Sequence, residues 1–186
     1  FTYGVQDIPY EGYANQRMDM TDNRSDQFNL AYTGSLGWGT LQARAYYQHT
    51  EHEMDFGDDK RFWYGAQSGG MGMDGSACSP ISATCAAGMP MRTDGKNTGV
   101  TVSAAIPLAE QSLLRVGGEY QENRLDDWWP PSGAGMWPYD FLNLNDGQRD
   151  RYAAYGEWET STERWTHILG ARFETVDMSA GPVHGY

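Results

Sequence analysis

Alternation of apolar and polar residues with a period of two runs through most of the chain, and it constrains the fold more than any other feature. In residues 41–48 the odd positions are apolar and the even positions are mostly polar, and residues 100–108, 114–121, 151–159 and 167–174 repeat this pattern. Successive side chains of a strand point to opposite faces. The pattern therefore predicts about seven β-strands with one apolar and one polar face, the first near Phe1–Ile8.

Composition narrows the possible classes of protein. The 186 residues include 23 Gly, 12 Tyr and 7 Trp, which argues against a disordered chain or a helical bundle. Lys and Arg number 13 against 25 Asp and Glu, so the net charge of −12 argues against nucleic acid as a partner, because phosphate binding needs clustered cations. The sequence has no apolar stretch near the roughly 18 residues of a transmembrane helix.

Short and long connections alternate strictly along the chain. The connections near residues 37, 110 and 162 are short, whereas residues 57–96 and 129–148 form long polar loops. In an up-and-down sheet this order places all tight turns at one end, as in outer-membrane barrels with short periplasmic turns and long external loops. The run Leu113–Trp128 would span about 50 Å, more than a bilayer requires.

These features predict an all-β, antiparallel, up-and-down transmembrane β-barrel in which residues 1–186 form a partial arc. Barrels made from one chain have about 8 strands or more, so about seven strands of this length are expected to belong to a larger barrel and a longer protein. The predicted polar faces carry many charged residues, which a barrel would turn toward a wet lumen: Arg44, Arg115, Glu119, Arg151, Glu157, Arg172 and Glu174.

A soluble β-sandwich is the alternative, because it would turn the same charged residues toward bulk water. Such a domain would bind carbohydrate or act on it through exposed tryptophans such as Trp128 and Trp129. The neighbouring Asp126 and Asp127 would point to opposite faces of a strand, so they do not make a glycosidase pair. The sequence also lacks the common hydrolase, P-loop and zinc-protease motifs, so we expect no enzyme.

Methionines gather in the long connections and at the strand ends that face them. Three pairs are spaced Met-x-Met, and His52-Glu53-Met54 has the same spacing. In an extended segment this spacing puts both side chains on one face. Thioether and imidazole together are soft ligands suited to copper, especially Cu(I), although loop methionines also serve as apolar filler. The candidate metal ligands are His52 and Met54, followed by Met89 and Met91.

Cys78 and Cys85 are the only cysteines, and both lie in the longer loop. An even number of cysteines in an exported chain favours a disulfide that closes the tip of this loop, with thiolate binding of a soft metal as the alternative. The other histidines, His49, His167 and His184, are isolated in the sequence, and His167, on an otherwise apolar face, is interpreted as structural or interfacial.

Tryptophans occur near both kinds of connection. Trp38 and Trp165 lie beside short turns, and Trp128 and Trp129 precede a long loop. We interpret them as two aromatic belts at the interfaces of a bilayer, because barrels carry aromatic girdles on both sides of their apolar band.

Several motifs occur in order over nearly the whole chain. They are Asn15–Thr21 (NQRMDMT), His52–Phe56 (HEMDF), Gly88–Met91 (GMPM), Leu125–Pro131 (LDDWWPP), Asn143–Arg151 (NLNDGQRDR) and Gly181–Tyr186 (GPVHGY). On these motifs the chain resembles the TonB-dependent outer-membrane receptors, specifically their copper-receptor branch.

This resemblance implies a barrel of about 22 strands in the outer membrane of a Gram-negative bacterium. An N-terminal plug domain would fill the barrel and link it to the TonB energy-transducing complex. Copper ion or a copper complex would be the transported ligand, with no resident cofactor, and a siderophore-like metal chelate is the alternative cargo. The family's barrel-side His-x-Met pair matches His52 and Met54. Its second ligand pair, a Cys and a Met of the plug, has no counterpart in this chain, and Cys78 and Cys85 are not equated with it.

Overall fold

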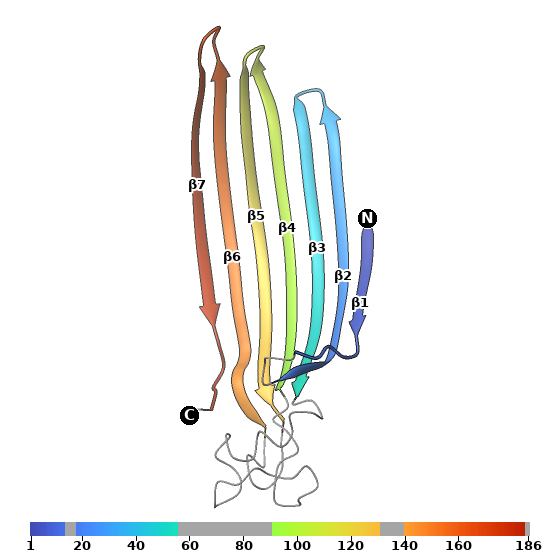
Figure 1. The fold of residues 1–186 in the computed structure, drawn as a ribbon. Helices are drawn as coiled ribbons and strands as arrows, with labels where there is room; N and C mark the ends of the chain where they lie inside the picture. Colours follow the sequence, from blue (N-terminus) through green and yellow to red (C-terminus); the bar gives the residue numbers. More distant parts are fainter. Residues whose placement is uncertain (14–17, 56–90, 131–139, 185–186) are drawn as a thin grey trace, which may run out of the picture.

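The computed structural model describes residues 1–13, 18–55, 91–130 and 140–184, which form a single antiparallel sheet (Figure 1). Its seven strands follow one another in chain order from edge to edge. They are β1 (Thr2–Ile8), β2 (Asp19–Leu36), β3 (Gly39–Asp55), β4 (Met91–Ala109), β5 (Ser112–Trp129), β6 (Phe141–Ser161) and β7 (Thr166–Ser179). The predicted number of strands and their up-and-down order are confirmed, and β1 and β7 leave both edges of the sheet open.

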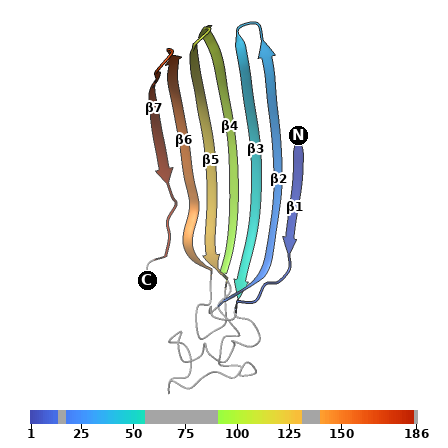
Figure 2. The ribbon, with the colours of Figure 1, turned by 45° about the horizontal axis from the view of Figure 1, so that its top comes forward.

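The three short turns lie together at one end of the sheet, at the top of Figures 1 and 2. The β2–β3 turn requires a glycine at Gly39, whose φ of 150° is unfavourable for other residues. A Cβ atom at this position would also collide with the carbonyl oxygen of Ala105 in β4. The opposite end of the strands is where the long connections begin and end, as the loop lengths predicted.

Two strands begin earlier than expected. β4 starts at Met91 and β6 at Phe141, so residues 91–96 and 141–148 belong to strands and not to the long loops. In the first segment both faces are polar, which hides the alternation. In the second, a β-bulge opposite Leu125–Trp128 adds residues to β6 and breaks the period of two. Asp146 in this bulge has a φ of 48°.

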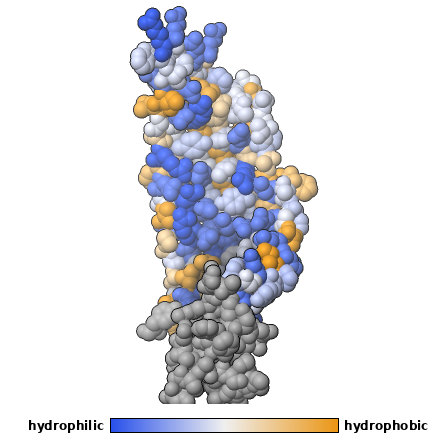
Figure 3. Space-filling model, viewed as in Figure 1, coloured by the Kyte–Doolittle hydropathy of each residue, from blue (hydrophilic) through white to orange (hydrophobic). Residues whose placement is uncertain are grey.

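One face of the sheet is polar and carries several ion pairs between neighbouring strands. The register places all seven charged residues predicted for the polar side on this face. Arg115 contacts both Glu157 and Glu159 at 2.7 Å, and Glu119 accepts hydrogen bonds from Arg151 and Arg172. Hydrophilic side chains cover a large part of the face visible in Figure 3. The charges of these strands therefore balance one another across neighbouring strands.

The other face is apolar in its turn-proximal half, and the described residues leave it uncovered. Val102, Phe173 and Leu169 keep 46%, 70% and 71% of their surface exposed. Among the described residues no second sheet and no helix packs against this face. No helix in this part of the chain is long and apolar enough to cross a membrane. A β-sandwich buries such a face between two sheets, so the described fold does not support the soluble alternative.

The apolar half has clear borders. Along β4 it runs from Val100 to Leu108, about 26 Å at the usual rise per residue. Trp38 and Trp165 lie at its turn end, as predicted, while aromatic residues in two neighbouring rows mark its other border. Tyr3, Phe28 and Tyr47 form one row, and Tyr120 and Tyr152 lie two residues nearer the turns, in the row of Val100. Beyond this border the same face becomes charged, for example at His49, Glu51 and Arg124.

The second border differs from the predicted belt. Trp128 lies eight residues beyond Tyr120 along β5, or about 26 Å, with charged residues of the same face between them. Trp129 stacks on Phe141, with ring centroids 5.2 Å apart. Tyrosine and phenylalanine, which the sequence analysis did not single out, therefore form the border of the apolar surface, and a belt at Trp128 and Trp129 stays a prediction.

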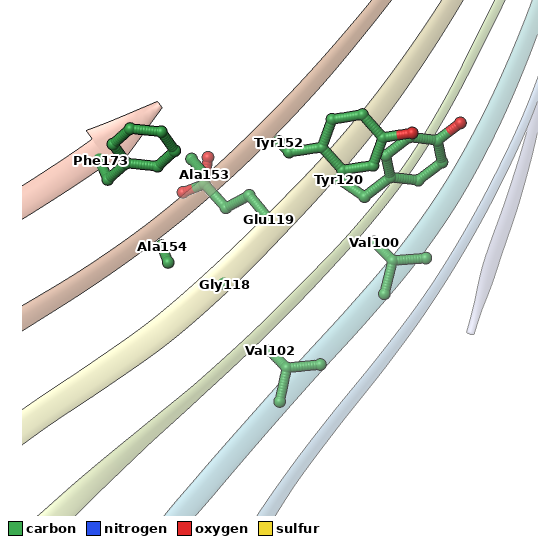
Figure 4. Close-up of a pocket in the computed structure, with 9 residues that line it drawn as sticks. All are labelled: Val100, Val102, Gly118, Glu119, Tyr120, Tyr152, Ala153, Ala154 and Phe173. Atoms are coloured by element: carbon green, nitrogen blue, oxygen red, sulfur yellow. The ribbon is translucent and has the colours of Figure 1, made fainter. Parts of the chain in front are cut away.

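A shallow groove of about 450 Å³ crosses the apolar face (Figure 4). Gly118 and Ala154 form its floor, because they have little or no side chain. Val102 and Phe173 lie in line with them in the register, and the rings of Tyr120 and Tyr152, 4.9 Å apart, lie in the next row.

Candidate metal-binding site

His52 and Met54 lie near the end of β3 that leads into the long connection, and both belong to the polar face of the sheet. Their neighbours on β3 confirm this face, because Thr50 lies 3.1 Å from Ser25 and Gln48 donates to Ser25. The period of two therefore places the imidazole and the thioether on one side, as the spacing predicted.

Asn23 on β2 lies directly opposite His52 and fixes its ring. The Nδ1 atom of His52 is 3.0 Å from the Oδ1 atom of Asn23. An amide oxygen only accepts hydrogen bonds, so this contact fits a ring with its proton on Nδ1 and its lone pair on Nε2. This is the tautomer in which a neutral histidine binds a metal through Nε2.

Three methionines lie side by side across neighbouring strands next to His52. The register pairs Met54 of β3 with Met20 of β2 on one side and with Met91 of β4 on the other. Met20 is 5% exposed, and Met54 and Met91 are half-buried. We name Met20, Met54 and Met91 the methionine row. The strand pairing thus brings Met91, a predicted ligand, to the candidate site. Met20, which the sequence analysis did not name as a ligand, lies there as well.

The polar face also carries a carboxylate, Asp127, and both of its oxygens accept hydrogen bonds. Thr93 of β4, opposite His52, donates a hydrogen bond of 2.9 Å to Asp127 of β5. The second oxygen of Asp127 accepts a hydrogen bond of 2.8 Å from Asn143. On the polar face, the residues paired with Met54 are therefore the thioethers Met20 and Met91, while His52 also lines a pocket with Asp22, Glu51, Glu53 and Asp94.

A harder set of donors lies on the opposite face. His49, Glu51 and Asp94 bring one ligand atom each within 4.8 Å of one another, and His49 Nε2 is 3.0 Å from Asp94 Oδ1. The sequence analysis described His49 as isolated, but in the structure β4 brings Asp94 beside it. His184 is likewise engaged, since its Nδ1 accepts a hydrogen bond from the backbone N–H of Leu142.

The remaining candidates, Met89, Cys78 and Cys85, lie outside the described residues. The expected disulfide and the ligand role of Met89 remain predictions.

Comparison with known proteins assigns this fold to a family. Residues 1–185 match the family model described as TonB dependent receptor-like, beta-barrel. The chain belongs to the TonB-dependent receptor β-barrel family. The all-β, up-and-down sheet with two open edges is accordingly an arc of a larger barrel.

A solved structure named copper transporter OprC is similar to this receptor segment. Its TM-score is 0.71 at 18% sequence identity, and the match covers 96% of this chain and 26% of that one. At this identity the similarity concerns the fold. A search of curated proteins finds no match.

Proposed function

We propose that this chain is part of the barrel wall of an outer-membrane receptor that takes up copper ions or a copper complex. The apolar half of one face would contact lipid, because its length of about 26 Å agrees with the apolar band of known barrels. The polar face would line the lumen. The charged continuation of the strands would then stand outside the bilayer, on the side of the long connections.

The observation that carries the proposal is the pairing of His52 and Met54 on the polar face, with Asn23 holding the imidazole. A neutral imidazole and a thioether form a donor set that suits copper better than magnesium, calcium or zinc. The name of the structurally similar copper transporter agrees with this donor set.

The proposed uptake is capture followed by release and includes no covalent step. His52 and Met54 would offer Nε2 and Sδ to copper from the barrel wall, and a plug domain, as the family resemblance implies, would complete the site. Remodelling of the plug by the TonB complex would lower the affinity and release the ion. The excess of acidic residues would attract cations toward the lumen weakly and in a salt-dependent way.

Binding measurements on the complete receptor test the proposal. Purified full-length protein in detergent is titrated with Cu(I), Cu(II), Zn(II) and a ferric siderophore. Copper is expected to bind tightest, with zinc weaker and the ferric chelate unbound. Tight binding of the ferric chelate, or a preference for zinc over copper, would overturn the proposal.

Asn23 provides a second test, since it acts only through His52. Asn23→Leu removes the acceptor for Nδ1 and is expected to lower copper affinity about 10-fold, the lower end of the effect of such outer partners. Asn23→Asp keeps an oxygen at this place and is expected to retain the affinity. Equal copper affinity of the Leu variant and the wild type in the same titration would show that Asn23 does not position the ring.

A further inference from the structure

We propose that the groove on the apolar face binds one acyl chain of an outer-leaflet membrane lipid, so that the receptor holds a lipid molecule at a fixed place on its wall. This inference rests on the proposed assignment of the apolar face to lipid and goes beyond it. An even apolar surface contacts lipid chains without preference for any place, whereas a groove selects one.

The groove is a gap in a surface that is raised on both sides. Gly118 of β5 and Ala154 of β6 lie directly opposite each other and contribute only a hydrogen atom and a methyl group. In the same row Val102 of β4 and Phe173 of β7 stand on either side of them (Figure 4). These two side chains are three strand spacings apart, or about 14 Å. The volume of about 450 Å³ lies in the range of sites that bind small molecules.

An aromatic pair marks the polar end of the groove. The rings of Tyr120 and Tyr152 are 4.9 Å apart and lie in the next row, on the side of the long connections. The hydroxyl of Tyr120 donates a hydrogen bond of 3.1 Å to Glu122, beyond the aromatic border. Tyrosines of this kind are common at the lipid–water interface. Because the short turns of such barrels are periplasmic, the groove lies in the outer leaflet, and a chain in it would run toward the turns.

The lining determines the class of the occupant. Val102 and Phe173 offer only hydrocarbon and keep 46% and 70% of their surface exposed. Glu119 also borders the groove, but its carboxylate lies on the polar face, where Arg172 donates to it at 2.9 Å. Polar molecules would lose their hydrogen bonds to water in this groove without replacement. Within a bilayer the hydrocarbon chains of lipids therefore fit it best.

Shape would supply the affinity. Lipid tails are as apolar as the groove, so binding there depends on van der Waals packing and not on the hydrophobic effect. A chain between Val102 and Phe173 touches protein on its floor and on its sides, which increases the number of close atom contacts. Continuous pairing from β4 to β6 fixes the floor before a chain arrives, so little freedom is lost on binding.

The test fills the groove in the full-length receptor with Gly118→Val and Ala154→Val combined. Valine favours strands, and a Cβ atom at Gly118 would meet its nearest neighbour, the carbonyl oxygen of Ala153, at an ordinary distance of 3.6 Å. Ala43→Val with Ala45→Val is the matched control. Both of these alanines lie on the same face and in the same two rows of β3, outside the groove.

Delipidated receptor is titrated with dipalmitoyl phosphatidylethanolamine, and native mass spectrometry counts the bound lipids. We expect one lipid to bind the wild type more tightly than all others. Its affinity is expected to fall about 10-fold or more in the filled variant, the lower end of the effect of one methylene group in an apolar pocket. The control is expected to match the wild type. Gly118→Val alone replaces the double variant if that variant fails to assemble.

Photo-crosslinking gives a second readout. A diazirine on the acyl chain, activated in lipid vesicles, is expected to label β5 and β6 of the wild type more strongly than those of the filled variant. Equal lipid affinity of the wild type and the filled variant, or a wild type without a preferred lipid, would overturn this inference alone. A wild-type dimer that the filled variant loses would also overturn it, since a second copy would then occupy the groove. Failure of the lipid-facing assignment would differ, because arginine would be tolerated equally on either face of β4.

Discussion

Replacing His52 with Ala and Met54 with Leu in the complete receptor is expected to lower its copper affinity by about 100-fold or more. Loss of an outer partner of a metal ligand already costs about 10- to 100-fold, and this double variant removes two proposed ligands themselves. Both side chains lie on the polar face, away from the apolar surface, and the ring of His52 is hydrogen-bonded to Asn23 of the neighbouring strand. The barrel is therefore expected to fold normally. Copper affinity and copper accumulation by cells are the measurements.

The control for this experiment uses the same residue types elsewhere in the sheet. His167→Ala with Met178→Leu changes a histidine and a methionine of β7, both exposed and four strands away from β3. This variant is expected to keep wild-type affinity. If the His52 and Met54 variant also kept it, copper would not be bound at this place in the barrel.

Ala104→Arg is expected to destabilise the barrel strongly, whereas Ala105→Arg is expected to be tolerated. Ala104 lies on the apolar face between Leu41 and Val116, near the middle of the apolar surface. An arginine facing lipid at the midplane of a bilayer costs about 2–4 kcal/mol. Ala105 faces the polar side beside Arg115, whose acidic partners Glu157 and Glu159 lie close by.

This pair of variants changes one residue type into another at neighbouring positions of one strand, so that only the face differs. The free energy of unfolding of the full receptor in lipid vesicles, together with the yield of assembled receptor in outer membranes, measures the effect. Equal costs for the two variants, or a larger cost for Ala105→Arg, would contradict the assignment of the apolar face to lipid.

Much of the fold could be predicted because strands carry a local signal. The period of two identified the strands around Ala43, Val102 and Phe173 and assigned their faces correctly. It failed where the signal is absent, as in residues 91–96, where both faces are polar. It also failed at the bulge of β6, where Asp146 interrupts the period. The aromatic border at Tyr47 and Tyr120 was not predicted, since it depends on how the strands are aligned.

The sequence by itself determined that His52 and Met54 lie on the same face of the sheet, because residues two positions apart in a strand share a face whatever the strand pairs with. Only the tertiary structure decided which residues of other strands lie beside His52 and Met54. Asn23, Met20 and Met91 come from strands whose register no local pattern specifies, and a shift of one residue turns every side chain to the other face. An extra residue in the β2–β3 pairing, Thr21, brings Met20 beside Met54, and hydrogen bonding between the strands sets that place.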